Sequence, residues 1–149
     1  TVTFTSQNYG AGDFQRCKKV YRLCMIFSVI FCGLLSGVFV LGRDFFVRLY
    51  TTDPNVLTFA VQRLLIVTTL ELLTTYEISG GAMRGFGHSL TPALITVVGS
   101  CVLRLIWINT VCRAVHEFWV VMIIYPISWV LTGTAMITAY LLLRRKLMR

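Results

Sequence analysis

The sequence predicts an all-α polytopic membrane helix bundle with about four transmembrane helices, and three observations support this. The 149-residue chain is 56% hydrophobic with a mean hydropathy of +0.76, whereas soluble domains are about 45–50% apolar. Residues 23–42 and 118–143 contain no charged side chain, and each run has the length of about 20 residues that a helix needs to cross a bilayer. Most of the 14 Lys and Arg residues flank apolar runs, which indicates membrane topology and lipid headgroup contact rather than nucleic-acid binding.

In the N-terminal third of the chain, the sequence predicts a polar segment followed by one membrane-spanning helix. Residues 1–6 are expected to be the tail of an earlier helix, and residues 7–13 (QNYGAGD) a turn, because two glycines and an aspartate break helical periodicity. Residues 14–22 carry four basic side chains and are interpreted as an interfacial helical lead-in. The first span follows at residues 23–41. Its Gly33 and Gly37 have the small-xxx-small spacing that lets another helix approach closely.

Three further spans are expected from the remaining apolar runs, at residues 56–82, 90–112 and 118–143. The connections between the spans are expected at residues 43–55, 85–89 and 113–117. Asp53 and Pro54 favour a helix start, because Asp caps a helix well and Pro suits the first helical position. Pro126 predicts a kink inside the last span.

The basic side chains also predict an orientation. Nine of them would lie on one side of the membrane, namely Arg16, Lys18, Lys19, Arg22, Arg84, Arg144, Arg145, Lys146 and Arg149. Three would lie on the other side, namely Arg43, Arg48 and Arg113. Cytoplasmic loops carry the excess of Lys and Arg. The first turn, the middle turn and the C-terminus are therefore expected to be cytoplasmic.

Two acids within the second span are the first candidates for chemistry. Charges inside spanning helices are costly and often mark a transport path. At 100° per residue, Glu77 shares a helix stripe with Arg63 and Arg84, whereas Glu71 projects to one side of it. Glu77 could bind Na⁺ or a proton, or offset a cationic substrate, or it could only form a structural salt bridge to Arg84 or Arg104. Glu71 could be a second proton site or the partner of Arg63 or Arg104.

Three more side chains complete the set of candidates. Arg104 lies deep in the third span and is interpreted as a structural charge that needs an acid or carbonyl partner. Arg63 is a second intramembrane charge, which can extend to the interface through its long side chain. Tyr76 could line a substrate cavity or could simply pack between helices.

Enzymatic and metal sites are not expected. The five cysteines form no CxxC pair, and most lie inside apolar runs, where packing explains them. His88 and His116 fall in loops on opposite sides of the expected membrane and cannot share a metal. Neither glycine-rich turn matches a phosphate-binding loop. We therefore expect no cofactor beyond a coupling ion, and no nucleic-acid partner.

Several segments, taken in order, resemble one family of transporters. QNYGAGD followed by RCKKVYR resembles the cytoplasmic loop after the second helix of each half in MATE transporters. The run EISGGAMRGFGHSLTP, from Glu77 to Pro92, looks like the junction of the tenth and eleventh helices in bacterial members. SCVLRLIWI (residues 100–108) and YPISW (residues 125–129) look like the last two helices. The resemblance spans nearly the whole chain.

This resemblance implies a twelve-helix protein of two six-helix bundles, in which this chain supplies the last four helices. Such proteins expel drugs and organic cations against inward Na⁺ or H⁺ flow. Glu77 matches an acid of many bacterial members and is implied to couple ion and substrate, although Leu73, one turn earlier, is not acidic. The implied location is a bacterial inner membrane, and the implied partners are lipids, the N-terminal helices and a cationic substrate.

Other functions stay open at this point. A lipid-linked sugar flippase of the same superfamily is the nearest alternative within transport. A non-transporting membrane subunit would tolerate the combined neutralisation of Glu71, Glu77 and Arg104. A small four-helix exporter acting as a dimer would carry its essential Glu in the first helix, and residues 23–42 have no acid.

Overall fold

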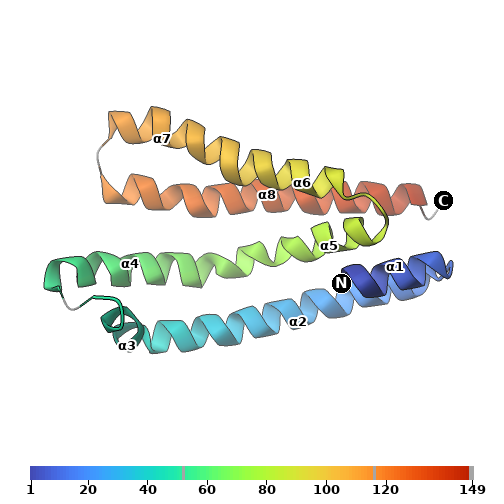
Figure 1. Cartoon of the computed structure of the whole chain (residues 1–149), viewed down its shortest axis with the longest axis horizontal. Coiled ribbons are helices and arrows are strands. Elements are labelled where there is room, and N and C mark those ends of the chain that lie inside the picture. Colours follow the sequence, from blue (N-terminus) through green and yellow to red (C-terminus); the bar gives the residue numbers. More distant parts are fainter. Residues whose placement is uncertain (52, 116, 148–149) are drawn as a thin grey trace.

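The computed structural model describes residues 1–51, 53–115 and 117–147, and in these residues it contains helices and turns without β-strands. Four long antiparallel rods lie side by side (Figure 1). Four helical stretches are long and apolar enough to cross a membrane, at Phe14–Leu41, Val56–Gly85, Leu90–Ala114 and Trp119–Leu147. The expected membrane helix bundle is confirmed, and each expected span lies within one rod.

The first rod is preceded by a short helix that folds back on it. Helix α1 (Val2–Gly10) ends at a tight turn in which Gly12 has a φ of +73°. The predicted turn at residues 7–13 is therefore wrong for residues 7–10, because the backbone leaves the helix only after Gly10. Helix α2 (Phe14–Leu41) then begins with Asp13, whose side chain accepts a hydrogen bond from the Arg16 backbone N–H at 2.9 Å.

The predicted loop at residues 43–55 is partly wrong as well, because helix α3 (Arg43–Arg48) occupies its first half. Asp44 in the first turn and Arg48 in the last turn suit the helix dipole. Phe46 packs on Phe39 of α2, with ring centroids 4.6 Å apart. The short helix therefore folds against the end of the first rod.

The second rod is not one uniform helix. It consists of α4 (Pro54–Leu70), a 3₁₀ segment η1 (Glu71–Tyr76) and α5 (Glu77–Gly85). The hydroxyls of Thr74 and Thr75 donate to carbonyls three residues earlier, at 2.7 and 2.9 Å. Such back-bonding competes with the α-helical pattern. The rod is therefore overwound at η1, which the apolar pattern did not reveal.

The third and fourth rods form a hairpin, shown above the others in Figure 1. The third consists of α6 (Leu90–Thr96), a π-helical segment η2 (Val97–Val102) and α7 (Leu103–Ala114). The predicted loop at residues 113–117 is wrong for its first two residues, which end α7. Helix α8 (Phe118–Leu147) continues through Pro126.

The end of the bundle that holds the C-terminus also holds the turn before α2 and the turn between α5 and α6 (Figure 1). Those three segments carry the excess of basic residues in the sequence, so the structure groups them as the four-span topology requires. The other end holds α3, the end of α7 and the start of α8.

Close packing between helices occurs at the glycine face of α5, which we define as Gly80, Gly81 and Gly85. A Cβ atom added at Gly85 would lie 2.6 Å from Thr5 Cβ of α1, and one at Gly80 would lie 3.4 Å from Met136 Sδ of α8. Missing side chains therefore let neighbouring helices approach closely. The buried hydrophobic cluster lies around this face, and comprises Cys17, Tyr76, Ala82, Met83, Phe86, Met136 and Tyr140.

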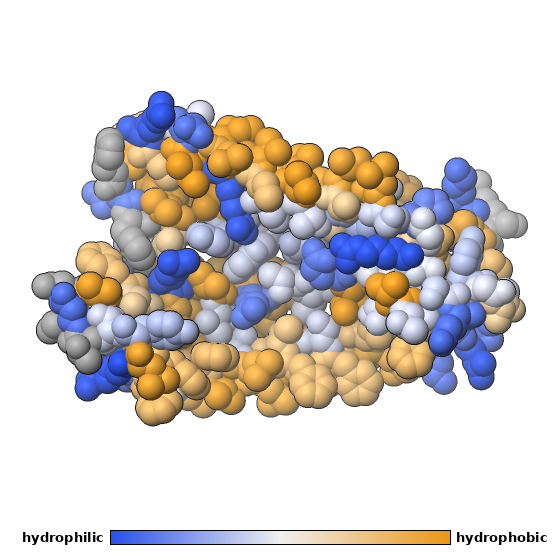
Figure 2. Space-filling view, in the orientation of Figure 1, coloured by the Kyte–Doolittle hydropathy of each residue, from blue (hydrophilic) through white to orange (hydrophobic). Residues whose placement is uncertain are grey.

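Gly33 and Gly37 behave differently from the expectation. A Cβ atom at either position would have no neighbour within 4 Å among the described residues. No helix of this part of the chain approaches them. The surrounding face of α2 is apolar and exposed, with Phe31 61% and Leu34 65% exposed. Hydrophilic side chains instead gather along the middle of the visible face and at its ends, between hydrophobic margins (Figure 2).

Candidate functional site

Glu77 is the first residue of α5, directly after the 3₁₀ segment. Its Oε2 lies 3.9 Å from Arg84 Nη2, and its Oε1 accepts a long hydrogen bond of 3.5 Å from Thr96 Oγ1 of α6. Both contacts are near the outer limit for such interactions. The carboxylate therefore joins α5 to α6 with weak contacts and keeps capacity for another cation.

The exposure of this pair supports the same conclusion. The Glu77 side chain is 44% exposed and that of Arg84 is 40% exposed. A half-exposed ion pair adds little to stability. The salt bridge to Arg84 considered from the sequence is present, but its geometry leaves the carboxylate accessible.

Tyr76 precedes Glu77 and is buried, with 5% of its surface exposed. Its ring closely approaches α8, since a Cβ atom added at Gly133 would lie 2.9 Å from Tyr76 Cδ1. The structure therefore places Tyr76 as a packing residue that fixes the start of α5 against the other hairpin.

Glu71 lies apart from the other candidates. It begins η1 on the exposed surface of the rod, and its backbone carbonyl accepts the hydrogen bond from Thr74. Among the described residues it forms no ion pair with Arg63 or Arg104. The hypothesis that Glu71 is the partner of either arginine is therefore not supported by this geometry.

Arg104 of α7 is held by neutral groups of α8. Its Nε and Nη2 donate to Ser128 Oγ at 3.3 and 3.2 Å, and its guanidinium carbon lies 4.6 Å from the centroid of the Tyr125 ring. Ser128 Oγ in turn donates to the Tyr125 carbonyl at 2.8 Å. No acid of the described ranges pairs with Arg104, so the ion pair expected for it is absent there.

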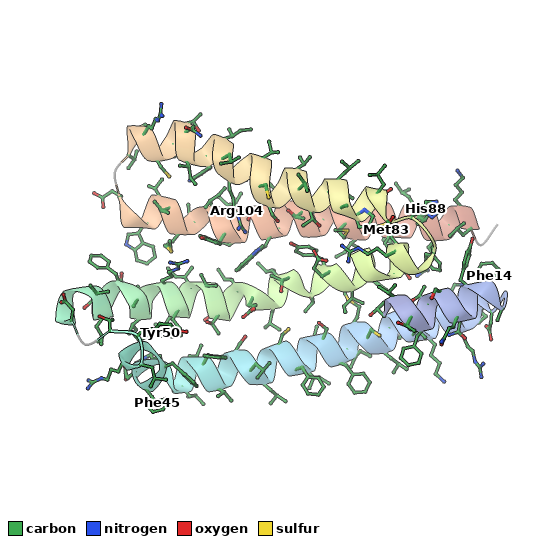
Figure 3. The ribbon with its side chains drawn as sticks, in the orientation of Figure 1. Phe14, Phe45, Tyr50, Met83, His88 and Arg104 are labelled. Carbon is green, nitrogen blue, oxygen red and sulfur yellow. The ribbon has the colours of Figure 1, made fainter. Side chains whose placement is uncertain are left out.

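A cavity of about 980 Å³ lies beside this arginine. It is lined from α2, α3, α4, α7 and α8, and both Arg63 and Arg104 reach it. Figure 3 labels Arg104, and also Tyr50, which belongs to the same lining. The stripe predicted for Arg63 and Glu77 assumed a uniform α-helix, whereas the 3₁₀ segment η1 lies between them. Arg63 lines this cavity, and Glu77 contacts α6 instead.

Sequence reasoning missed two pairings that position these side chains. Thr96 lies 19 positions after Glu77, and no spacing signal connects them. Tyr21 of α2 forms a hydrogen bond of 3.0 Å with Ser79 of α5 and stacks on Tyr140 of α8, with centroids 4.2 Å apart. Tyr21 occurs within the basic lead-in, where the charge pattern concealed its packing role.

Within the described ranges, no three His, Cys, Asp or Glu side chains gather as a metal site. The features that could act on a ligand are therefore the accessible carboxylate of Glu77 and the arginine-lined cavity. Both lie within helices that are apolar enough to cross a membrane.

Comparison with known proteins identifies the family. The family model MatE matches residues 1–108, which extend from α1 through the first half of α7. The chain belongs to the MatE family. The match ends before Tyr125–Trp129, so the resemblance of that last segment lies outside it.

Curated relatives of this MatE chain agree with the assignment. It is 26% identical over 97 residues to Multidrug and toxin extrusion protein 1 of Homo sapiens, which covers 64% of this chain and 17% of the relative. It is 24% identical over 90 residues to Probable multidrug resistance protein NorM of Idiomarina loihiensis, which covers 60% of this chain and 20% of the relative. The chain thus matches a fifth or less of these relatives' length. The relatives' names describe multidrug extrusion and multidrug resistance, and the family assignment of this chain rests on the match over residues 1–108.

Proposed function

We propose that this chain forms the last four helices of a secondary antiporter that exports drugs or organic cations in exchange for Na⁺ or H⁺. The main support for this function is the carboxylate of Glu77. It lies in a helix apolar enough to cross a membrane, is nearly half exposed and has only long contacts to Arg84 and Thr96. A carboxylate in such surroundings can bind a cation or a proton, and binding either would release Arg84. The names of the relatives support drug efflux.

The N-terminal helices of the longer protein and the surrounding lipids are the proposed partners. The exposed apolar face of α2 is consistent with such coverage. The proposed location is the bacterial inner membrane, with the C-terminal end of the bundle in the cytoplasm. This orientation is supported by the basic residues grouped at that end.

Dye efflux tests the role of Glu77. Glu77→Gln keeps the shape of the side chain but removes its charge. We expect this variant, in the complete transporter, to reduce efflux of a fluorescent cationic dye at least tenfold, with an unchanged amount of protein in the membrane. Glu117→Gln is the matched control, because Glu117 is an exposed acid outside the helices. Unchanged efflux in Glu77→Gln would remove Glu77 from the mechanism.

The same assay separates the alternatives. Efflux that survives the combined loss of Glu71, Glu77 and Arg104 would favour a non-transporting subunit. An intact, correctly inserted wild-type protein that moves no cationic dye would favour the lipid-linked sugar flippase.

A further inference from the structure

The cavity between α4 and α8 differs chemically from the surroundings of Glu77. Its volume of about 980 Å³ is within the range of pockets that hold small organic ligands. Its walls are mostly apolar and aromatic, and they include Phe39, Tyr50, Tyr125 and Trp129. Its two charged lining residues are Arg63 and Arg104, and no acid occurs among the described residues that line it.

The positive charge of Arg104 is only partly satisfied. A guanidinium carries five N–H donors, and two of the hydrogen bonds from Arg104 go to the neutral Ser128 hydroxyl. The Tyr125 ring covers one face of the cation. Three N–H donors have no recorded acceptor within the described ranges, and neutral partners do not cancel the charge.

Both arginines lie at similar depths from the same end of the bundle. Arg63 follows the start of α4 by about nine residues, and Arg104 precedes the end of α7 by about ten, so each lies roughly 14–15 Å from that end. This depth is close to half of the roughly 30 Å hydrocarbon thickness of a bilayer. Cations at such depth are costly unless an anion accompanies them.

We propose that this cavity binds an amphipathic anion, with its phosphate or carboxylate head at Arg63 and Arg104 and its apolar chain against the aromatic wall. Guanidinium groups bind two oxygens of a carboxylate or a phosphate in bidentate fashion. Tyr125 and Trp129, whose centroids lie 6.1 Å apart, provide an apolar surface beside the head. The site is separate from Glu77 and goes beyond the proposed export of cations.

Tryptophan fluorescence provides the test, because Trp129 lines the cavity. The protein is prepared with Trp129 as its only tryptophan and reconstituted in phosphatidylcholine nanodiscs. Two quenchers are titrated, a brominated alkyl phosphate and a brominated alkyltrimethylammonium of equal chain length. We expect saturable quenching by the phosphate only. Equal quenching by both compounds would overturn the proposal.

Variants that remove one positive charge test whether the anionic head of the ligand lies at Arg63 and Arg104. Arg63→Gln and Arg104→Gln should each raise the half-saturating phosphate concentration about tenfold or more, because each removes a charged hydrogen-bond donor. Arg113→Gln removes the same charge from an exposed position at the end of α7, outside the cavity, and should change nothing. Arg63 and Arg104 variants that bind like Arg113→Gln would refute the site.

The experiment also accounts for a variant that fails to fold and identifies the source of the anion. Arg63 is exposed and has no recorded ion pair among the described residues, so Arg63→Gln decides the question even if Arg104→Gln fails to fold. Anionic phosphatidylglycerol nanodiscs identify the source of the anion: weaker quenching there indicates a lipid headgroup in the site, and unchanged quenching indicates a free amphiphile. This readout is binding rather than dye efflux, so a negative result for Glu77→Gln leaves it intact.

Discussion

At one end of the bundle, α5 lies against α1 and α8 through glycines, whereas toward the other end α4 and α8 border an open cavity that holds two arginines. At the glycine face, absent side chains let the neighbouring helices approach closely. At the cavity, large aromatic and cationic side chains leave volume between the helices. The difference indicates that one end provides stability for this part of the protein while the other provides space for a ligand.

The largest expected difference comes from deleting volume at each end. Met136 is fully buried against the glycine face, so Met136→Ala should destabilise the protein by about 2–5 kcal/mol through the cavity it leaves. Phe39 lines the open cavity and is 40% exposed, so Phe39→Ala should cost about 1 kcal/mol. Thermal unfolding in detergent measures both. Equal losses would contradict the contrast between the ends.

Adding a methyl group should give the next largest effect. In Gly85→Ala, the new Cβ would lie 2.6 Å from Thr5 Cβ and 3.0 Å from the Val2 carbonyl oxygen. The helices must separate, at a cost of about 1–3 kcal/mol. The same change at Gly37 meets nothing within 4 Å and should stabilise α2 by up to about 1 kcal/mol. A tolerated Gly85→Ala would show that α1 is not held tightly against α5.

The smallest effect concerns a polar atom within the tight end. Thr5 Oγ1 is buried and has no hydrogen-bond partner within the described part of the chain. Thr5→Val keeps the shape while removing the unsatisfied hydroxyl, and should raise stability by about 1 kcal/mol. The exposed Thr3→Val is the control and should be neutral. A loss of stability at Thr5→Val would indicate that the hydroxyl has an acceptor beyond these residues.

The membrane helix bundle could be predicted from the sequence because the bilayer imposes two simple requirements. Each span needs a charge-free run that matches the bilayer thickness, and basic residues flank the spans. The sequence was not sufficient for the local winding. A membrane span is apolar on most of its faces, so its hydrophobic pattern did not indicate the 3₁₀ segment η1 or the π-helical segment η2. Helix α3 was mistaken for a loop because six residues are too few for a periodic signal.

The sequence selected candidate residues for the site but did not predict most of their contacts. Glu77 and Arg104 were selected as candidates because a charge inside a membrane span is costly. Arg84 was correctly considered as a partner of Glu77. The grouping of Arg63 with Glu77 assumed 100° per residue, and the 3₁₀ segment η1 between them does not follow that winding. The joint cavity of Arg63 and Arg104 depends on α4 and α7 facing each other across α8, and single-helix patterns carry no information on that.

The overwound segment η1 also has a mechanical meaning. A 3₁₀-helix turns about 120° and rises about 2.0 Å per residue, against about 100° and 1.5 Å in an α-helix. Rewinding the six residues of η1 would therefore shorten the rod by about 3 Å and rotate one half against the other by about 120°. Arg63 and Glu77 lie on either side of this segment. A change of η1 from 3₁₀ to α-helical winding would therefore couple a short axial displacement to a large rotation, and would change the direction that each charge faces.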